Sequence, residues 1–329
     1  MPMHRSEFAG RPLLDIGSYA RRGPGQRDRI SPAEIDLIRR TVTRTPEVMV
    51  KVLTQGGQNL KAVRAHIAYL HRHGDLEVES DQGERLVGQD VEYMLVEDWD
   101  LDVEEHRRRA ELRPQTDRAP PKLVHKILFS MPPGTPSKKV LAAVKNFARE
   151  EFGLKHRYAM VLHTDAPHPH VHMVLKAVSE RGERLNIRKA TLRKWRDDFA
   201  RQLRELGVPA NATERAVRGA SRPTWRDTIY RADIRRESTF LRKREGSIRQ
   251  ELGDRDGKPE KGRTTLLQTR RHVQAGWLSL AERMARDGMR EAADQTQRFI
   301  ERMPPTRTDE EWLAHRIRAQ SRDHDALTR

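Results

Sequence analysis

The chain has 329 residues, no cysteine, and 64 lysines and arginines against 48 acidic residues, which gives a formal charge of +16 at pH 7. The lack of cysteine excludes disulfides, thiolate nucleophiles and cysteine-ligated zinc, so histidine, aspartate and glutamate remain as metal ligands. The charge favours a polyanionic partner, nucleic acid first, although a merely cationic soluble protein is an alternative that charge alone leaves open.

Three regions of different character follow one another along the chain. Residues 1–45 are predicted to be a basic arm with little core and one helix from Ser31-Pro32, a common helix start. Residues 46–222 are predicted to be the folded domain, and residues 223–329 a basic, α-helical C-terminal region. No apolar run approaches the roughly 18 residues of a membrane span, and residues 1–26 lack a signal-peptide core. We therefore expect a soluble cytoplasmic protein without membrane insertion.

Hydrophobic periodicity divides the folded domain into strands and helices. From its start, the predicted elements are a strand over 48–53, a helix from Asn59 to Gly74, a short strand over 76–79, an acidic segment over 91–105 and a proline-rich loop over 113–121. They continue with a strand over 123–130, a helix over 137–151, strands over 158–163 and 170–177, and a helix over 189–206. Because adjacent strands can pair as hairpins, we expect an α+β fold with a mainly antiparallel central sheet covered by helices.

The C-terminal region is expected to hold helices only. Stretches rich in arginine and glutamate cover 225–252, 265–285, 289–302 and 310–320, with a hydrophilic linker over 253–262. Such charge runs are in most cases a solvated helical surface.

Three histidines border the loop between two predicted strands, in the sequence His163-Thr-Asp165-Ala-Pro-His168-Pro-His170-Val-His172. Since side chains alternate along a strand, His170 and His172 face the same way, and a hairpin brings His163 against them. Three neutral imidazoles suit a borderline divalent ion and leave positions for water or a phosphate oxygen. We therefore predict a divalent metal site at these three residues.

Two further residues of this stretch have less certain roles. Asp165 is placed to accept the free N–H of a ligating histidine or to take part in proton transfer, and the spacing leaves both open. His168 is expected to have a structural or DNA-contacting role. An isolated His-x-His pair is more often unligated than ligated, so the metal prediction depends on three rings in register.

The stretch has the form His-x-Asp-x-x-x-Pro-His-x-His and resembles the metal motif of conjugative relaxases in the HUH nuclease superfamily. The segments VMVKVLTQGG (48–57), AHIAYLHRHG (65–74) and HKILFSMPPGT (125–135) also resemble motifs of the tyrosine relaxases that include the T-DNA border endonuclease. The resemblance covers about residues 45–220. It implies an HUH relaxase-like fold with Tyr69 as nucleophile, the three histidines as metal ligands and Asp165 at the acidic position.

The resemblance also implies an activity and partners. The implied activity is site- and strand-specific nicking and rejoining of DNA at an origin of transfer, through a covalent 5′-phosphotyrosyl intermediate. The implied cofactor is a divalent ion, Mg2+ or Mn2+ first, with Zn2+ as the alternative. The implied partners are single-stranded or melted origin DNA, accessory relaxosome proteins and the coupling protein of a type IV secretion system. The implied setting is conjugative transfer or plasmid mobilisation in the bacterial cytoplasm, with export alongside the DNA into a recipient cell left open.

Helix periodicity gives independent information on Tyr69. Val63, Ile67 and Leu70 lie on the apolar stripe of its helix, and Tyr69 lies beside that stripe, so the phenol can point out of the core. From spacing alone, a tyrosine that merely borders the core is the commoner case, and the resemblance is what selects Tyr69. Tyr93 is the rival nucleophile, ranked lower because its acidic segment would repel DNA.

Candidate DNA contacts come from two sources. The resemblance places Ser130 and Thr135 in a strand-to-turn motif near the scissile phosphate. Basic side chains are expected to bind phosphates and to set affinity and salt dependence rather than sequence choice, although for each one taken alone a solvated charge is the commoner case. They are Arg21, Arg22, Arg27, Arg188, Lys189, Arg193, Lys194, Arg196, Arg215 and Arg218.

Several alternatives stay open at this point. A rolling-circle replication initiator or a transposase of the same superfamily would use the same chemistry, but the order of tyrosine before histidines favours a relaxase. A hydrolase acting through metal-bound water would not need Tyr69. A non-catalytic basic DNA-binding protein with a structural metal would normally offer four ligands, whereas this cluster offers three.

Overall fold

The computed structural model describes residues 30–53, 57–111, 121–221, 225, 227–235, 237–251 and 262–327. The chain divides into two compact units. The described residues from 44 to 212 form the first unit, and those of 30–43 and from 213 onward form the second. Each unit is described separately below.

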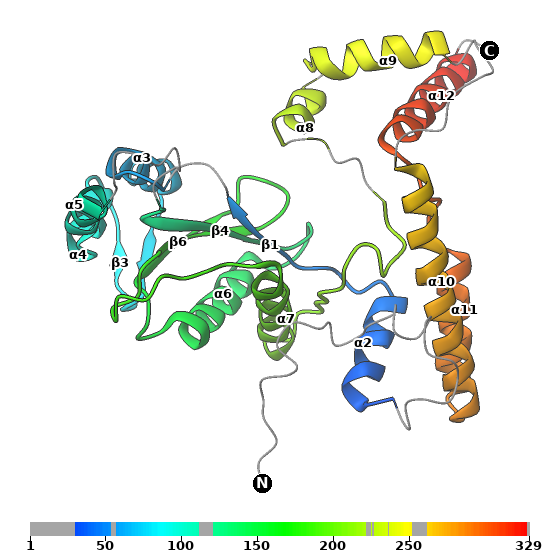
Figure 1. Ribbon diagram of the computed structural model, residues 1–329, viewed down its shortest axis with the longest axis horizontal. Helices are drawn as coiled ribbons and strands as arrows, with labels where there is room; N and C mark the ends of the chain where they lie inside the picture. The colour runs from blue at the N-terminus through cyan, green and yellow to red at the C-terminus, as the bar shows by residue number, and fades with distance from the viewer. Residues whose placement is uncertain are drawn as a thin grey trace. The chain divides into compact units, whose positions relative to one another are not determined.

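The first unit is built on a six-stranded sheet with the order β1-β4-β6-β5-β2-β3 (Figure 1). All five neighbouring pairs are antiparallel, which confirms the predicted α+β fold with an antiparallel sheet. The strands are β1 (Met49–Leu53), β2 (Val78–Ser80), β3 (Arg85–Leu86), β4 (Val124–Ser130), β5 (Tyr158–His163) and β6 (His170–Lys176).

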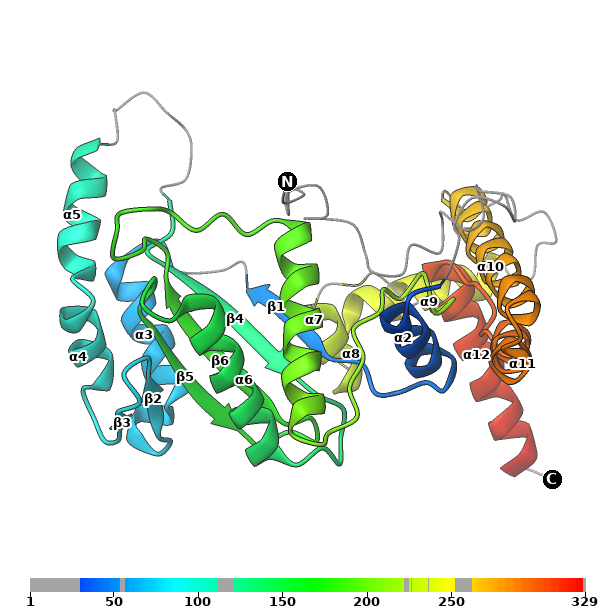
Figure 2. The same cartoon turned by 90° about the horizontal axis from the view of Figure 1, so that it is seen from below.

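Helices cover both faces of this sheet (Figures 1 and 2). On one face, here called the α6 face, α6 (Ser137–Phe152) and α7 (Lys189–Glu205) pack against the strands. A cluster of large rings fills that layer, with Phe129, Phe147 and Phe199 in tilted and edge-on contacts, an arrangement that aromatic pairs prefer.

The other face, here called the α3 face, is covered by α3 (Leu60–Leu70), α4 (Val91–Asp98) and α5 (Leu101–Glu111). The acidic segment over 91–105 thus forms α4 and the start of α5. Alternation along β6 decides which side chain enters which layer: Val171, Met173 and Leu175 pack in the α6 layer, and Val174 packs in the α3 layer. The even-numbered histidines of β6 therefore lie on the α3 face.

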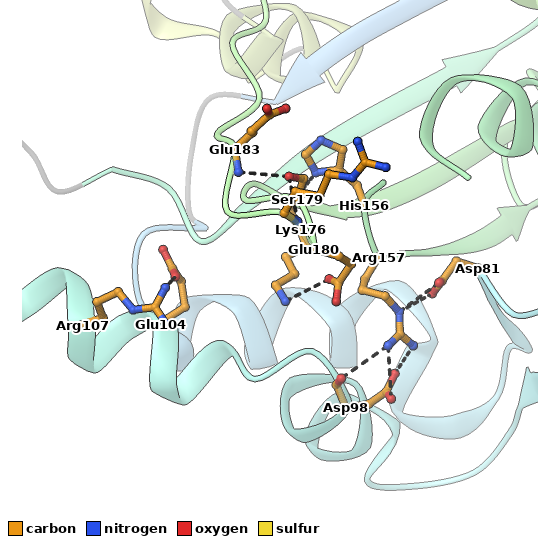
Figure 3. Close-up of polar contacts among 11 residues, drawn as sticks. Asp81, Asp98, Glu104, Arg107, His156, Arg157, Lys176, Ser179, Glu180 and Glu183 are labelled. Carbon is orange, nitrogen blue, oxygen red and sulfur yellow. Dashed lines mark hydrogen bonds and ion pairs between the residues drawn. The ribbon is translucent and has the colours of Figure 1, made fainter. Parts of the chain in front are cut away.

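Figure 3 shows a polar network at the end of the sheet where β5 begins. The Arg157 guanidinium bonds Asp81 after β2, with Nε 2.9 Å from Oδ2, and Asp98 at the end of α4. Nearby, Lys176 Nζ lies 3.2 Å from Glu180. The network anchors α4 and the β2–β3 turn to the start of β5, whereas His163 ends the same strand. It supports the fold at a distance from the histidines.

All regular elements in the described residues of the second unit are helices, as predicted for the C-terminal region. Its helices are α2 (Pro32–Val42), α8 (Asp227–Ile234), α9 (Thr239–Glu251), α10 (Arg263–Arg286), α11 (Arg290–Glu301) and α12 (Asp309–Leu327). The single stretch predicted over 225–252 is two helices, because the Ser238 hydroxyl accepts the Leu241 N–H at 3.2 Å and so caps a new one.

The helix predicted at Ser31-Pro32 is present as α2, with a capping box between Ser31 and Glu34. The expectation that this region carries little core is wrong for α2. Its Leu37 and Ile38 are buried in one cluster with Trp277 of α10 and Phe299 of α11. The helix therefore belongs to the second unit.

The predicted loop over 113–121 and the linker over 253–262 lie almost wholly outside the described residues. Among the helices that are described, none is both long and apolar enough to cross a membrane.

Candidate active site

His163, His170 and His172 converge on the α3 face. His163 ends β5 and pairs with His170 of β6 across the hairpin. Their ring centroids are 4.8 Å apart for His163 and His172 and 5.2 Å apart for the other two pairs. One ligand atom from each residue lies within 4.8 Å of the others. Two nitrogens on one ion are at most about 4 Å apart, so a small closure of the rings would place all three on a single ion.

Backbone carbonyls fix the proton positions on two of these rings. His163 Nε2 lies 2.8 Å from the carbonyl oxygen of Leu70, and His170 Nδ1 lies 2.9 Å from that of His168. Because a carbonyl can only accept, both nitrogens must carry hydrogen. His163 Nδ1 and His170 Nε2 therefore keep their lone pairs for a metal, an orientation typical of ligating histidines.

The environment keeps His163 and His172 in their ligand form. Burial lowers the pKa of His172 to about 3, and the neighbouring His163 and His170 add to the shift. Burial also lowers the pKa of His163, against an opposing effect of its hydrogen bond to Leu70. Neutral imidazoles bind metals and imidazolium ions do not. The residues present thus fit a divalent ion.

Tyr69 lies at the end of α3 and points away from the core. Its side chain is 65% exposed, whereas Val63, Ile67 and Leu70 of the same helix are at most 2% exposed. The predicted outward direction of the phenol is therefore confirmed. Since Leu70 follows Tyr69 and its carbonyl accepts from His163, the last turn of α3 lies against the histidine end of β5.

A buried histidine ends α3 earlier than predicted. The helix stops at Leu70 rather than at Gly74, and a 3-10 turn covers Arg72–Gly74. His71 is 1% exposed. Its Nδ1 accepts the Gly74 N–H at 2.8 Å, and its Nε2 lies 2.9 Å from Glu92 of α4. These contacts close the turn after Tyr69 and connect it to α4.

The rival tyrosine has a different environment. Tyr93 lies on α4 and is 51% exposed. The guanidinium carbon of Arg64 lies 4.8 Å from the centroid of its ring, a typical cation–π contact.

Asp165 contacts an arginine rather than a ligand ring. Its Oδ2 lies 2.5 Å from the Arg72 guanidinium, just after α3. Desolvation raises the pKa of Asp165, but a backbone hydrogen bond and the charge of Arg72 outweigh it and leave the pKa below its usual value. Among the described contacts, the free N–H groups of His163 and His170 donate to backbone carbonyls and not to Asp165. The carboxylate instead connects the histidine loop to the turn after Tyr69.

The strand-to-turn motif lies beside the trio. Ser130 ends β4, pairs with His170 and is 4% exposed. The Met131 N–H donates to the Pro169 carbonyl at 3.2 Å, and the Thr135 hydroxyl donates to the Pro132 carbonyl at 2.8 Å. The structure therefore brings Ser130 to the histidines, while Thr135 stabilises the turn that follows.

Most of the predicted basic contacts lie elsewhere. Arg188, Lys189, Arg193, Lys194 and Arg196 belong to α7 and its N-cap, and α7 packs on the α6 face, opposite the trio. Lys194 is already paired, with its Nζ 2.6 Å from Glu151 and 2.8 Å from Asp198.

The remaining basic candidates are not placed beside the histidines either. Arg215 and Arg218 belong to the second unit. Arg21, Arg22 and Arg27 lie outside the described residues.

Other side chains on the α3 face were missed by sequence reasoning. Met49 and Lys51 of β1 are exposed and stand opposite Ser130 and Leu128 of β4. Lys126 is on the same face of β4, two residues before Leu128, and is 6% exposed. The alternation of side chains along β4 predicts the position of Lys126, because residues 126 and 130 are an even number of positions apart and therefore share a face.

Comparison with known proteins shows which family this site resembles. Residues 75–208 match the family model described as "Relaxase: MobA/VirD2-like, nuclease domain". The matched segment contains β2 to β6 and all three histidines. Tyr69 lies just before it.

Three curated proteins, all named T-DNA border endonuclease VirD2, are similar to the chain. That of Agrobacterium fabrum (strain C58) is 24% identical over 222 residues, which are 62% of this chain and 48% of that protein. That of Rhizobium radiobacter is 28% identical over 200 residues, which are 54% of this chain and 44% of that protein. That of Rhizobium rhizogenes is 26% identical over 191 residues, which are 53% of this chain and 42% of that protein. The chain thus spans somewhat under half the length of these relatives.

The family match and the geometry agree on the same part of the molecule. The matched segment contains the histidine hairpin and every strand of the antiparallel sheet except β1. The segment that carries the three histidines is therefore similar to the nuclease domain of MobA/VirD2-like relaxases.

Proposed function

We propose that this chain nicks and rejoins one DNA strand at a specific site, with Tyr69 as the nucleophile. The observation that carries the proposal is the 2.8 Å hydrogen bond from His163 to the Leu70 carbonyl. It holds the last turn of the tyrosine's helix against one of three converging imidazoles. The match of residues 75–208 to a relaxase nuclease domain supports the same activity.

The proposed reaction is a transesterification. The Tyr69 oxygen forms a bond to the phosphorus of the scissile phosphodiester and loses its proton, while the bond from phosphorus to the 3′ oxygen breaks. That oxygen takes up a proton and becomes a free 3′-hydroxyl, and the 5′ phosphate stays on the tyrosine. One ester replaces another, so the 3′-hydroxyl can attack the phosphotyrosine and restore the strand.

His163, His170 and His172 would hold the divalent ion. When bound, it would supply charge neutralisation to a non-bridging oxygen of the phosphate. Among Mg2+, Mn2+ and Zn2+, three nitrogen donors suit Mn2+ or Zn2+ better than Mg2+, which prefers oxygen ligands.

Asp165 is proposed as a positioning residue. Its carboxylate is engaged by Arg72 at 2.5 Å, and this ion pair spans from the histidine loop to the turn that follows Tyr69. The pair therefore sets where the end of α3 lies relative to the metal ligands, without a direct part in proton transfer.

The DNA is proposed to cross the α3 face as a single strand. From the trio the face continues over Ser130 of β4 to Met49 and Lys51 of β1, and both β1 side chains are exposed. A methionine stem and a lysine ammonium suit a base and a phosphate of one strand. The basic residues of α7, with Thr135, Arg215 and Arg218, stay proposals for more distant contacts.

The biological setting is also part of the proposal. Nicking at an origin of transfer would begin conjugative transfer or plasmid mobilisation, in the bacterial cytoplasm and with relaxosome proteins and a secretion coupling protein as partners. The relaxase match supports this setting over a rolling-circle initiator or a transposase. The exposed Tyr69 beside the histidines supports the enzyme over a non-catalytic basic protein with a structural metal, because that alternative does not need a nucleophile.

The test is covalent capture. Wild-type protein, Tyr69→Phe and Tyr93→Phe are incubated with Mn2+ and a single-stranded DNA pool of randomised sequence. Covalent complexes that survive SDS are separated on denaturing gels, and the modified residue is mapped by mass spectrometry. We expect adducts on Tyr69 in the wild type and in Tyr93→Phe, none in Tyr69→Phe, and none with EDTA. An adduct that persists in Tyr69→Phe would remove this residue from the mechanism.

A further inference from the structure

A lysine is buried between the sheet and α3, close to the metal ligands. Lys126 lies in the middle of β4 and is 6% exposed. Its neighbour on the same face of β4, Leu128, stands opposite His172. Lys126 is thus a diagonal neighbour of His172, and the Cβ atoms of such a pair are somewhat less than about 7–8 Å apart. None of the hydrogen bonds and ion pairs among the described residues involves its ammonium.

A histidine of α3 faces the same region without a partner. His66 Nε2 is buried and has no hydrogen-bond partner among the described residues. His66 interacts electrostatically with Lys126 and with His172. It precedes Tyr69 by three residues, so the two side chains are neighbours on the helix. His66 is therefore close to Lys126 and to the proposed metal ligand His172, and it lies on the same helix as Tyr69.

This arrangement is unfavourable by itself. The ammonium of a lysine with a buried stem and no counter-ion loses part of its hydration free energy, and an unpaired imidazole nitrogen adds its own desolvation cost. A single anion can compensate both costs, because it can accept hydrogen bonds from the lysine and from the imidazole. Phosphate oxygens bind lysine ammonium well, and charge-assisted hydrogen bonds of this kind are stronger than neutral ones.

We propose that Lys126 and His66 form a phosphate-binding site for the DNA strand, separate from the three metal ligands. One backbone phosphate of the bound strand accepts from Lys126 Nζ and from the Nε2–H of His66, next to the phosphate held at the histidine trio. This inference rests on the proposed function and names the groups that hold the substrate beside the reacting one. Occupation of the site would also press the strand against the helix that carries Tyr69.

The test separates phosphate binding from chemistry. Binding of a fluorescent single-stranded oligonucleotide is measured by anisotropy over a range of salt concentrations, in the Tyr69→Phe background so that no covalent product forms. The variants are Lys126→Met, which keeps the apolar stem, Lys126→Arg, which keeps the charge, and His66→Leu. Lys138→Met is the matched control, because Lys138 is exposed on α6 at the other face.

We expect Lys126→Met to weaken binding and to reduce the slope of log affinity against log salt by about 0.7, the value for one phosphate of a single strand. Lys126→Arg and Lys138→Met should keep the parent slope, and His66→Leu should weaken binding. Because methionine keeps the buried apolar stem and removes a charge without a counter-ion, the melting temperature without DNA should not fall.

Two results would overturn the inference. One is an unchanged salt slope in a folded Lys126→Met protein. The other is a Lys126→Met protein that melts well below its parent or does not fold, since the ammonium would then serve the fold. Failure of the proposed function has a different signature, which is the lack of any covalent adduct in wild-type protein whatever the salt slope.

Discussion

His125 provides a quantitative test of the sheet and its two faces. It precedes Lys126 on β4, so its ring lies on the α6 face, away from the metal ligands. Its Nε2 is buried and has no hydrogen-bond partner among the described residues. Burial lowers the pKa of His125 from 6.5 to about 4, with the charge of Lys122 adding to the shift and a hydrogen bond to the Leu185 backbone opposing it.

The sign of the pH effect follows from this shift. Between pH 6.5 and pH 4 the unfolded chain binds a proton at His125 and the folded chain does not, so the free energy of unfolding falls as the pH falls. Each pH unit in that window is worth about 1.36 kcal/mol. From pH 7 to pH 5 the loss from this one ring is therefore at most about 2 kcal/mol, since partial contact with solvent reduces it.

The perturbation is His125→Gln, which cannot titrate in this range and keeps an N–H donor for the Leu185 carbonyl. Urea unfolding is followed at pH 7 and pH 5 by pulsed hydrogen exchange of peptides from β4, β5 and β6. This readout reports the sheet unit without the helical one. The control His272→Gln removes an exposed imidazole of α10 in the second unit.

We expect the loss of stability between pH 7 and pH 5 to be smaller in His125→Gln than in the wild type, by up to about 2 kcal/mol. The control should keep the wild-type loss. If His125→Gln also keeps the full loss, the ring is not held neutral in the α6 layer, and the assignment of β4 side chains to the two faces is refuted.

Two further substitutions test how the end of α3 is held. Arg72→Met removes the ion pair with Asp165. Both side chains are about half exposed, so the free energy of unfolding should fall by less than about 1 kcal/mol. The rate of adduct formation, measured on denaturing gels, should also fall, because the histidine loop loses its contact with the turn after Tyr69. Asn59→Ala removes the cap at the Ala62 N–H, 2.8 Å away, and should cost about 1 kcal/mol, seen as faster hydrogen exchange of residues 60–70; an unchanged exchange rate would contradict the capping role.

Strong periodicity is what made much of the fold predictable. In β6, Val171, Met173 and Leu175 alternate with His170 and His172, and only a strand with an apolar and a polar face has that pattern. The predicted strands over 123–130, 158–163 and 170–177 therefore lie within a residue of β4, β5 and β6. The same alternation predicts that His170 and His172 share one face, and the hairpin predicts His163 beside them. The structure brings the three together.

Long-range packing explains what could not be predicted. The amphipathic pattern of α7 shows that one side is buried, but it does not say which face of the sheet the helix covers. The sequence predicts the basic residues of α7 as DNA contacts, whereas the helix packs on the α6 face, opposite the histidines. Likewise, the apolar residues of α2 gave no sign that their partners would be Trp277 and Phe299, more than two hundred residues later.

The hydrogen bond that matters most for the proposed chemistry joins a side chain to a backbone carbonyl, and residue types do not mark the carbonyl. Tyr69 and His163 are far apart in sequence, and the link between them is a hydrogen bond from an imidazole to the backbone carbonyl of Leu70. Every residue has such a carbonyl, so no pattern of residue types marks this one. Motif spacing can therefore nominate a tyrosine and three histidines separately. Only the packing of α3 on the sheet brings them together, because Val63, Ile67 and Leu70 must bury their side chains against β5 and β6.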